Sequence, residues 1–209
     1  MVSRDRAIAW LEQHVPQKRI DHILRVEQTA IALAQQHNLD PEQAGQAGLL
    51  HDLAKYFKPK KLLKMVREEG TPIDPVEEAN PHLLHAQASA IVARDTFGVR
   101  DRQILDAVSS HTLGQPGMSP LSCIVFLADS LEPGRGDTAA LEQLRRESAK
   151  DLNRAVWLTC DYTLSQLLET RKLIHPRAIL TRNWFLQTAK AEKKAKKRKA
   201  ACVNETRSA

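Results

Sequence analysis

The chain has 209 residues, of which 42% are hydrophobic and only 4% aromatic, which fits one globular domain with a real hydrophobic core. It has no apolar run of membrane-spanning length and no apolar signal-peptide core, which argues against membrane-spanning and secreted proteins. The three cysteines are far apart and odd in number, so we expect reduced thiols in a cytoplasmic protein rather than a disulfide framework.

The formal net charge of +6 belongs to the end of the chain. Residues 189–209 contain eight of the 31 basic residues and two of the 25 acidic ones, so the remainder is formally neutral. Because a run of like charges repels itself, we expect a domain over residues 1–188 and a basic tail over 189–209 that is disordered or only partly helical. The tail is either a solvated segment without a dedicated partner or a weak contact for RNA, ribosomes or another polyanion.

Helical periodicity runs along the whole body of the chain. Ser3 begins a predicted helix over 3–15, and a second follows at about 19–37. Asp40 and Pro41 form the cap and the first position of a third helix, at about 41–56. Further helices are expected at about 59–69, 75–79, 82–97, 101–111, 119–131, 138–146, 149–170 and 176–188. Since no stretch alternates with a period of two, the sequence predicts an all-α fold.

The conspicuous chemical feature is the dipeptide His51–Asp52. Adjacent residues on a helix point about 100° apart, so both side chains can reach one metal ion lying against that helix. Gly48, one turn earlier, leaves room for a neighbouring helix or a ligand. In many chains such a pair is only a surface hydrogen bond, so the other polar residues on inward faces decide its interpretation.

Those other residues are histidines and one aspartate. His22 lies on an apolar helix face, where it is either a ligand or a core histidine with a satisfied ring. His82 and His85 are one turn apart, and only one of them need point inward, while His111 ends an apolar face. Asp129 ends an apolar run, where a buried carboxylate needs a partner or a metal ion, although it could also reach solvent.

Together these residues form one candidate ligand set from five helices. Mixed imidazole and carboxylate ligands suit iron, manganese or zinc, and six ligands are more than one ion usually takes from protein. Inward side chains of a helical bundle can assemble a dinuclear site. The sequence therefore predicts a dinuclear metal site in the core of a helical bundle, with the ligands His22, His51, Asp52, His85, His111 and Asp129.

The order H…HD…D in this set resembles the HD-domain metal-dependent phosphohydrolase superfamily, and His85 and His111 resemble the extra histidines of its dinuclear members. Longer strings resemble the bacterial YqeK-type family, the HD-domain symmetrical diadenosine tetraphosphate hydrolases, over about residues 18–185. The strings are Arg19–Val26, Leu49–Lys55, Leu83–His85, Ser110–Met118, Ala128–Arg135 and Leu173–Pro176. The basic tail lies outside this resemblance.

The resemblance implies metal-dependent, symmetrical hydrolysis of diadenosine tetraphosphate to two ADP through a hydroxide that bridges two metal ions. Together with the ligand set it favours iron, with manganese next. Asp52 is the expected bridging ligand. Lys55 and Arg135 are expected to bind the substrate and to stabilise charge on its phosphoryl oxygens. The alternatives are a solvated lysine, and an arginine paired with Glu132 or Asp137.

Two further histidines, His82 and His175, are candidates for lining the nucleotide pocket, with structural roles as the alternative. Two other functions stay open at this point. One is an HD-domain phosphohydrolase acting on another nucleotide, either a mononucleotide or a signalling nucleotide. The other is a non-catalytic helical module that binds RNA or ribosomes through the basic tail. The sequence leaves the oligomeric state open, a homodimer included.

Overall fold

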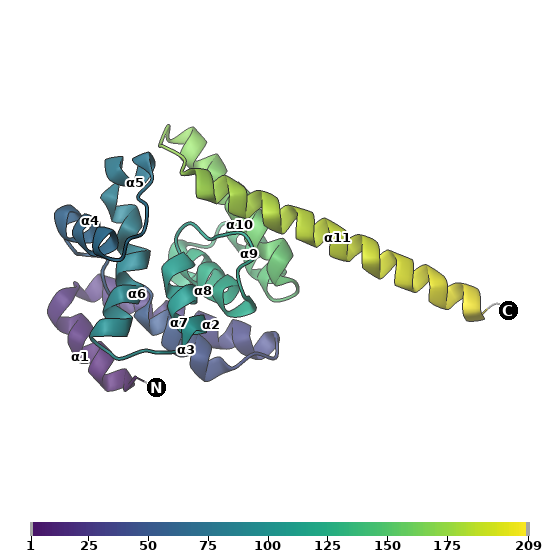
Figure 1. The fold of residues 1–209 in the computed structure, drawn as a ribbon. Coiled ribbons are helices and arrows are strands. Elements are labelled where there is room, and N and C mark those ends of the chain that lie inside the picture. The colour runs from purple at the N-terminus through teal and green to yellow at the C-terminus, as the bar shows by residue number, and fades with distance from the viewer. Residues whose placement is uncertain (1, 208–209) are drawn as a thin grey trace.

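The computed structural model describes residues 2–207, and the side chains of that range as far as Ala195. In this range the chain forms eleven α-helices, two short 3₁₀ helices and no strand, so the all-α prediction is confirmed (Figure 1). None of the described helices has the length and apolarity needed to cross a membrane. In chain order they are α1 (Arg4–His14), α2 (Gln17–Gln36), α3 (Pro41–Leu50), α4 (Pro59–Glu68), α5 (Pro75–Ala79), η1 (Pro81–Leu84), α6 (His85–Asp95), α7 (Arg102–Ser110), α8 (Pro120–Leu131), η2 (Pro133–Arg135), α9 (Ala139–Ser148), α10 (Leu152–Glu169) and α11 (Pro176–Arg207).

Side-chain caps begin several of these helices where the sequence places them. The Ser3 side chain accepts a hydrogen bond from the Arg6 N–H at the start of α1. Asp40 accepts from two backbone N–H groups at the start of α3, and Pro41 occupies its first turn. Each cap satisfies donors that have no partner within the helix, which is why polar residues mark these starts.

The core is built around α8, which lies in the middle of the bundle (Figure 1). Every residue from Leu121 to Ala128 is buried, and the helix packs against α2, α3, α7 and α10. A helix that is apolar all round is stable only when other helices cover it on several sides. This burial brings the end of α8, with the mostly buried Asp129, to the edge of the bundle core.

α2 and α3 pack against each other most closely, at Gly48. A Cβ atom at this position would lie 3.0 Å from Glu27 Cα, so only glycine allows the two backbones to approach so far. This contact fixes the end of α3, and with it the His51–Asp52 dipeptide, against the helix that carries His22.

The third helix is shorter than expected. It ends at Leu50, and residues 51–56 form consecutive turns instead of continuing to Tyr56. The Ala54 N–H donates to the buried Ser89 Oγ at 3.0 Å, so it is not available for a helical bond to Leu50. The His51–Asp52 pair therefore lies in a turn held by α6, and not on a helix face as predicted.

Two further expectations need adjustment. The helix expected over 82–97 is divided into η1 and α6, with His85 as the first residue of α6. The helix expected to end near residue 188 continues to Arg207 and projects away from the bundle (Figure 1). Lysine, alanine, arginine and glutamate dominate the added segment, and all of them favour a helix intrinsically. Side chains beyond Ala195 lie outside the described set, and the division into a domain and a tail stays a prediction.

Candidate metal centre

The structure brings the six predicted ligand residues together. His22 comes from the middle of α2, while His51 and Asp52 follow the end of α3. The other three are His85 at the start of α6, His111 directly after α7, and Asp129 in the last turn of α8. All are buried except Asp129, whose side chain is 19% exposed and therefore marks the open side of the cluster.

In all four imidazole rings the Nδ1 atom has a hydrogen-bond partner outside the cluster, and the Nε2 atom faces the other ligand residues. In His51, His85 and His111 the Nδ1 atom donates to the backbone carbonyl three residues earlier, at 2.6, 2.5 and 2.7 Å. In His22 the Nδ1 atom lies 3.0 Å from a carboxylate oxygen of Glu132. Because Nδ1 is committed as the donor, the neutral ring keeps its lone pair on Nε2, the form in which histidine binds a metal ion.

The four Nε2 atoms converge on two carboxylates. Asp52 Oδ1 lies 3.2 Å from His85 and 3.7 Å from His111, and Asp52 Oδ2 lies 3.5 Å from His51 and 3.9 Å from His22. Asp129 Oδ1 lies 3.1 Å from His22 and 3.9 Å from His51. The two oxygens of Asp52 thus face two different pairs of histidines.

The contacts inside the cluster fit a bound cation. The Nε2 atoms of His22 and His51 and Asp52 Oδ1 are buried without a hydrogen bond. The Nε2 atoms of His85 and His111 lie 3.1 Å apart, so with both Nδ1 atoms protonated their lone pairs face each other. Two sets of three ligand atoms lie within 4.8 Å of one another, His22–His51–Asp129 and His51–Asp52–His111. A metal ion would satisfy these buried groups, which otherwise carry a desolvation cost.

The electrostatics keep the ligands in their metal-binding protonation states. Burial lowers the pKa of His51, and it lowers that of His111 to about 3 with the help of the neighbouring histidines, so these rings stay neutral. Burial opposes ionisation of Asp52, but His51 and His85 outweigh it and hold the pKa of this carboxyl well below its usual value. Burial likewise opposes ionisation of Asp129, and its contacts with His22, the two neighbouring histidines and Arg135 outweigh burial, so its pKa is lowered too.

The two predicted phosphate-binding residues lie beside the cluster. Lys55 Nζ is 3.0 Å from His85 Nε2, and burial lowers the pKa of this ammonium. Arg135 donates from Nε to the Asp129 backbone oxygen at 2.8 Å and from Nη2 to the Asp129 carboxylate. Arg135 therefore pairs with a ligand residue, with Glu132 farther away at 4.0 Å, and its side chain is 40% exposed.

The two other histidines differ in position. The His82 backbone oxygen accepts a hydrogen bond from His85 Nδ1, its side chain is exposed, and its pKa is lowered first by burial and then by Lys55 and His85. His175 is buried elsewhere, with Nε2 3.5 Å from Glu77 Oε1 of α5. Its contacts join the start of α11 to α5 and do not involve the six ligand residues.

Two residues at the cluster are absent from the sequence-based ligand and substrate sets. Arg19 donates from Nη1 to Asp52 Oδ2 at 3.0 Å. Glu132 accepts from His22 Nδ1. Arg19 lies one turn before His22, and Glu132 one turn after Asp129, so helical spacing from a ligand could have pointed to both.

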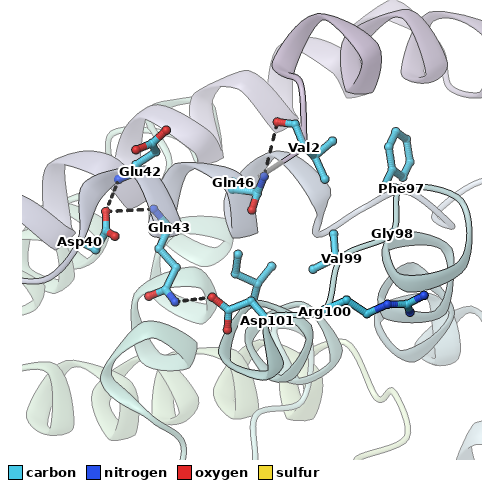
Figure 2. Close-up of a pocket in the computed structure, with 11 residues that line it drawn as sticks. Val2, Asp40, Glu42, Gln43, Gln46, Phe97, Gly98, Val99, Arg100 and Asp101 are labelled. Atoms are coloured by element: carbon cyan, nitrogen blue, oxygen red, sulfur yellow. Dashed lines mark hydrogen bonds between the residues drawn. The ribbon is translucent and has the colours of Figure 1, made fainter.

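A different pocket, of about 440 Å³, lies at the opposite end of α3 (Figure 2). Its lining comes from the start of α3 and the loop before α7, and contains none of the six ligand residues. Gln43 donates to Asp101 across it at 2.7 Å, and Gln46 donates to the Val2 oxygen at 3.5 Å (Figure 2). These two glutamines already have hydrogen-bond partners within the pocket, and none of the six candidate ligand residues lines it. The His/Asp cluster therefore remains the candidate functional site.

The helical bundle and its His/Asp cluster define a protein of the HD-domain class, and comparison with known proteins agrees. The model of the HD domain matches residues 19–134. A Bacillus subtilis protein named symmetrical bis(5'-nucleosyl)-tetraphosphatase is 33% identical over 186 residues, which cover 88% of this chain and 98% of that protein. A Mycoplasma genitalium protein named probable nicotinate-nucleotide adenylyltransferase/Ap4A hydrolase is 32% identical over 160 residues, which cover 74% of this chain and 45% of that longer protein.

A solved structure gives the same result. The crystal structure of a Clostridium acetobutylicum protein, described as a predicted HD superfamily hydrolase involved in NAD metabolism, is 34% identical with a TM-score of 0.85, over 90% of this chain and 99% of that chain. The chain therefore belongs to the HD-domain hydrolases, in the family of the symmetrical bis(5'-nucleosyl)-tetraphosphatases. The resemblance and the enzyme class predicted from the sequence are confirmed.

Proposed function

We propose that this enzyme hydrolyses diadenosine tetraphosphate symmetrically to two ADP, using two metal ions held by the His/Asp cluster. The observation that carries the proposal is the convergence of four Nε2 atoms on the carboxylates of Asp52 and Asp129, with each Nδ1 atom already hydrogen-bonded. The names of the relatives supply the substrate. The reaction adds one water molecule and breaks one phosphoanhydride bond between the two central phosphorus atoms.

Asp52 is the proposed bridging ligand. Its two oxygens face different histidine pairs, which is the arrangement that a carboxylate shared between two ions requires. When bound, a pair of metal ions supplies a nucleophilic hydroxide at neutral pH and neutralises phosphate oxygens. The imidazole and carboxylate donors suit iron, which we propose as the native metal, with manganese next.

Three side chains are proposed to receive the polyphosphate. Lys55, Arg135 and Arg19 each place a cationic group against a ligand residue, at His85, Asp129 and Asp52 respectively. Charge-assisted hydrogen bonds from such groups would orient the phosphates and stabilise the charge that develops as the anhydride breaks. His82, beside Lys55, is proposed to contact the nucleotide at the same opening.

The contacts of His175 are with α5 and not with the six ligand residues. Because its ring contacts Glu77, we propose that its contribution to substrate binding consists in fixing the segment before α11. We further propose that the enzyme works in the cytoplasm, where its free buried cysteines, Cys123 and Cys160, would stay reduced.

Product analysis tests the proposed reaction. Purified protein is incubated with diadenosine tetraphosphate and iron or manganese, with and without a chelator. We expect two equivalents of ADP per substrate and loss of activity on chelation. ATP plus AMP would refute the symmetrical cleavage position while leaving the metal chemistry in place.

A second candidate is hydrolysis of another nucleotide. The description of the Clostridium acetobutylicum structure as involved in NAD metabolism favours it. If diadenosine tetraphosphate is not turned over, mononucleotides, signalling nucleotides and nicotinamide dinucleotides should be screened under the same conditions. Turnover of one of these with the same chelator sensitivity would select this candidate.

A further inference from the structure

Glu132 is a buried carboxylate beside the cluster that has no role in the proposed ligand set. It is 1% exposed and lies one turn beyond Asp129. Its Oε1 atom lies 3.0 Å from His22 Nδ1, and its Oε2 atom accepts from Arg25 Nε and from the Gly134 N–H, both at 2.5 Å. Three donors thus meet on one carboxylate, and together they join α2 to the segment that follows α8.

His22 needs this acceptor because of its place in the fold. The other three histidines lie at helix ends or helix junctions, where each ring can donate to the carbonyl three residues earlier. His22 lies inside α2, where the backbone carbonyls accept the helix's own hydrogen bonds. Its Nδ1–H therefore requires a side chain from another element, and Glu132 is the one that reaches it.

The surroundings of Glu132 hold it in a fixed position. Its two oxygens are contacted from α2, by His22 and Arg25, and by the backbone N–H of Gly134. Gly134 lies directly against the Arg25 guanidinium, since a Cβ atom at this position would lie 2.5 Å from Arg25 Nη2. With Arg25 in its present place, the absence of a side chain at position 134 leaves room for the guanidinium beside the carboxylate.

We propose that Glu132 is a positioning residue that holds the proton of His22 on Nδ1 and so directs Nε2, beside Asp129, toward a metal ion. Arg25 holds the carboxylate in place from its other side. This inference rests on the metal site of the proposed function but not on its substrate. Carboxylates that orient a liganding histidine typically account for a 10–100-fold difference in metal affinity.

The chain supplies a matched control in Glu77. This carboxylate is also 1% exposed, and it accepts hydrogen bonds from the Asp74 N–H at 3.0 Å and from Arg177 Nη2 at 3.5 Å. Its Oε1 atom also lies 3.5 Å from His175 Nε2. It lies away from the six ligand residues. Loss of Glu77 should cost stability through similar chemistry without changing metal affinity.

The experiment compares wild type, Glu132→Ala, Glu132→Gln and Glu77→Ala as full-length, metal-loaded proteins. Mn²⁺-loaded protein is equilibrated with increasing chelator, and the metal retained per chain is counted. We expect Glu132→Ala to release one equivalent at about 10–100-fold lower chelator concentration. Glu132→Gln, which keeps an acceptor for one donor, should lie between it and wild type, and Glu77→Ala should match wild type.

A spectroscopic measurement separates positioning from general stability. In Zn²⁺-loaded wild type, nitrogen NMR should show the His22 proton on Nδ1, and this signal should be lost in Glu132→Ala while circular dichroism stays helical. If Glu132→Ala fails to fold, Glu132→Gln carries the comparison.

Unchanged metal retention in the Glu132 variants, an unchanged His22 signal, or an equal loss of metal in Glu77→Ala would each overturn the inference. Wild type that retains no Mn²⁺ would overturn the metal site as well. Wild type that binds metal but does not cleave diadenosine tetraphosphate would refute only the proposed substrate.

Discussion

Gly48→Ala should destabilise the protein, because it forces apart two helices that touch through their backbones. The added Cβ would lie 3.0 Å from Glu27 Cα and 3.3 Å from both the Glu27 nitrogen and the Val26 oxygen. None of these backbone atoms can rotate away, so α2 and α3 must separate by a few tenths of an ångström. Overpacking costs about 1–3 kcal/mol, and replacing a helical glycine with alanine returns about 0.5–1 kcal/mol. The two ranges together predict a net loss of about 0–2.5 kcal/mol in the free energy of unfolding, with a middle value of about 1 kcal/mol.

Gly45→Ala is the matched control on the same helix. Its Cβ would meet Cδ1 and Cγ1 of Ile31 at 2.9 Å, which are the far end of a flexible side chain. Ile31 borders a pocket of about 190 Å³, so it has space into which it can rotate. The helix-propensity gain should then offset the steric cost, and we expect a change within about 1 kcal/mol of wild type.

Urea unfolding followed by circular dichroism measures the free energy of unfolding of both variants. A thermal melt gives a second readout, in which each kcal/mol corresponds to about 2–4 °C in Tm for a chain of this size. Gly48→Ala should also release metal more readily, since the Gly48 carbonyl is the acceptor for His51 Nδ1. Equal stability of the two variants, or a larger loss in Gly45→Ala, would refute the argument that a backbone obstacle is what makes Gly48 irreplaceable.

Three further predictions concern other parts of the molecule. Arg19→Ala removes a charged donor from a ligand carboxylate, so kcat/KM for ADP formation should fall about 10–100-fold with helicity unchanged; activity within twofold of wild type would contradict this. Burial raises the pKa of Cys123 and of Cys160 to about 12, so native Cys202→Ser protein at pH 8 should show no fast reaction with a thiol reagent and two reactive thiols after unfolding; a fast thiol in the native protein would disprove this burial. Deleting residues 189–209 should leave turnover within about twofold while abolishing any salt-sensitive RNA binding of the full chain; a large loss of turnover would show that the basic segment serves catalysis.

The sequence predicted which six residues lie together better than it predicted their local geometry. Helical periodicity and caps locate most helices within a few residues, because those signals are local. The end of α3 depends on Ser89, a residue 35 positions away from Ala54 that takes its N–H, and no local pattern reveals it. No local pattern reveals the role of Glu132 either, because it contacts His22, which lies 110 positions away in the sequence.

In the C-terminal segment two local signals predict different structures. Charge repulsion favours a disordered tail after residue 188, whereas the intrinsic preferences of lysine, alanine and arginine favour a helix. In the structure α11 continues past residue 188 as far as Arg207. Asn153 of α10 donates to Glu192 at 2.8 Å, a tertiary contact that holds the helix beyond the expected boundary and that periodicity alone does not predict.

The proposed function requires that metal ions held by the His/Asp cluster drive hydrolysis. The most direct test measures the rate of ADP formation from diadenosine tetraphosphate against the number of metal ions per chain, for wild type, His51→Ala and Asp52→Ala. We predict that the wild-type rate rises to its maximum at two ions per chain and that both variants stay inactive at every loading while remaining helical. Near-normal turnover in either variant with full metal content, or by metal-stripped wild type, would contradict this requirement.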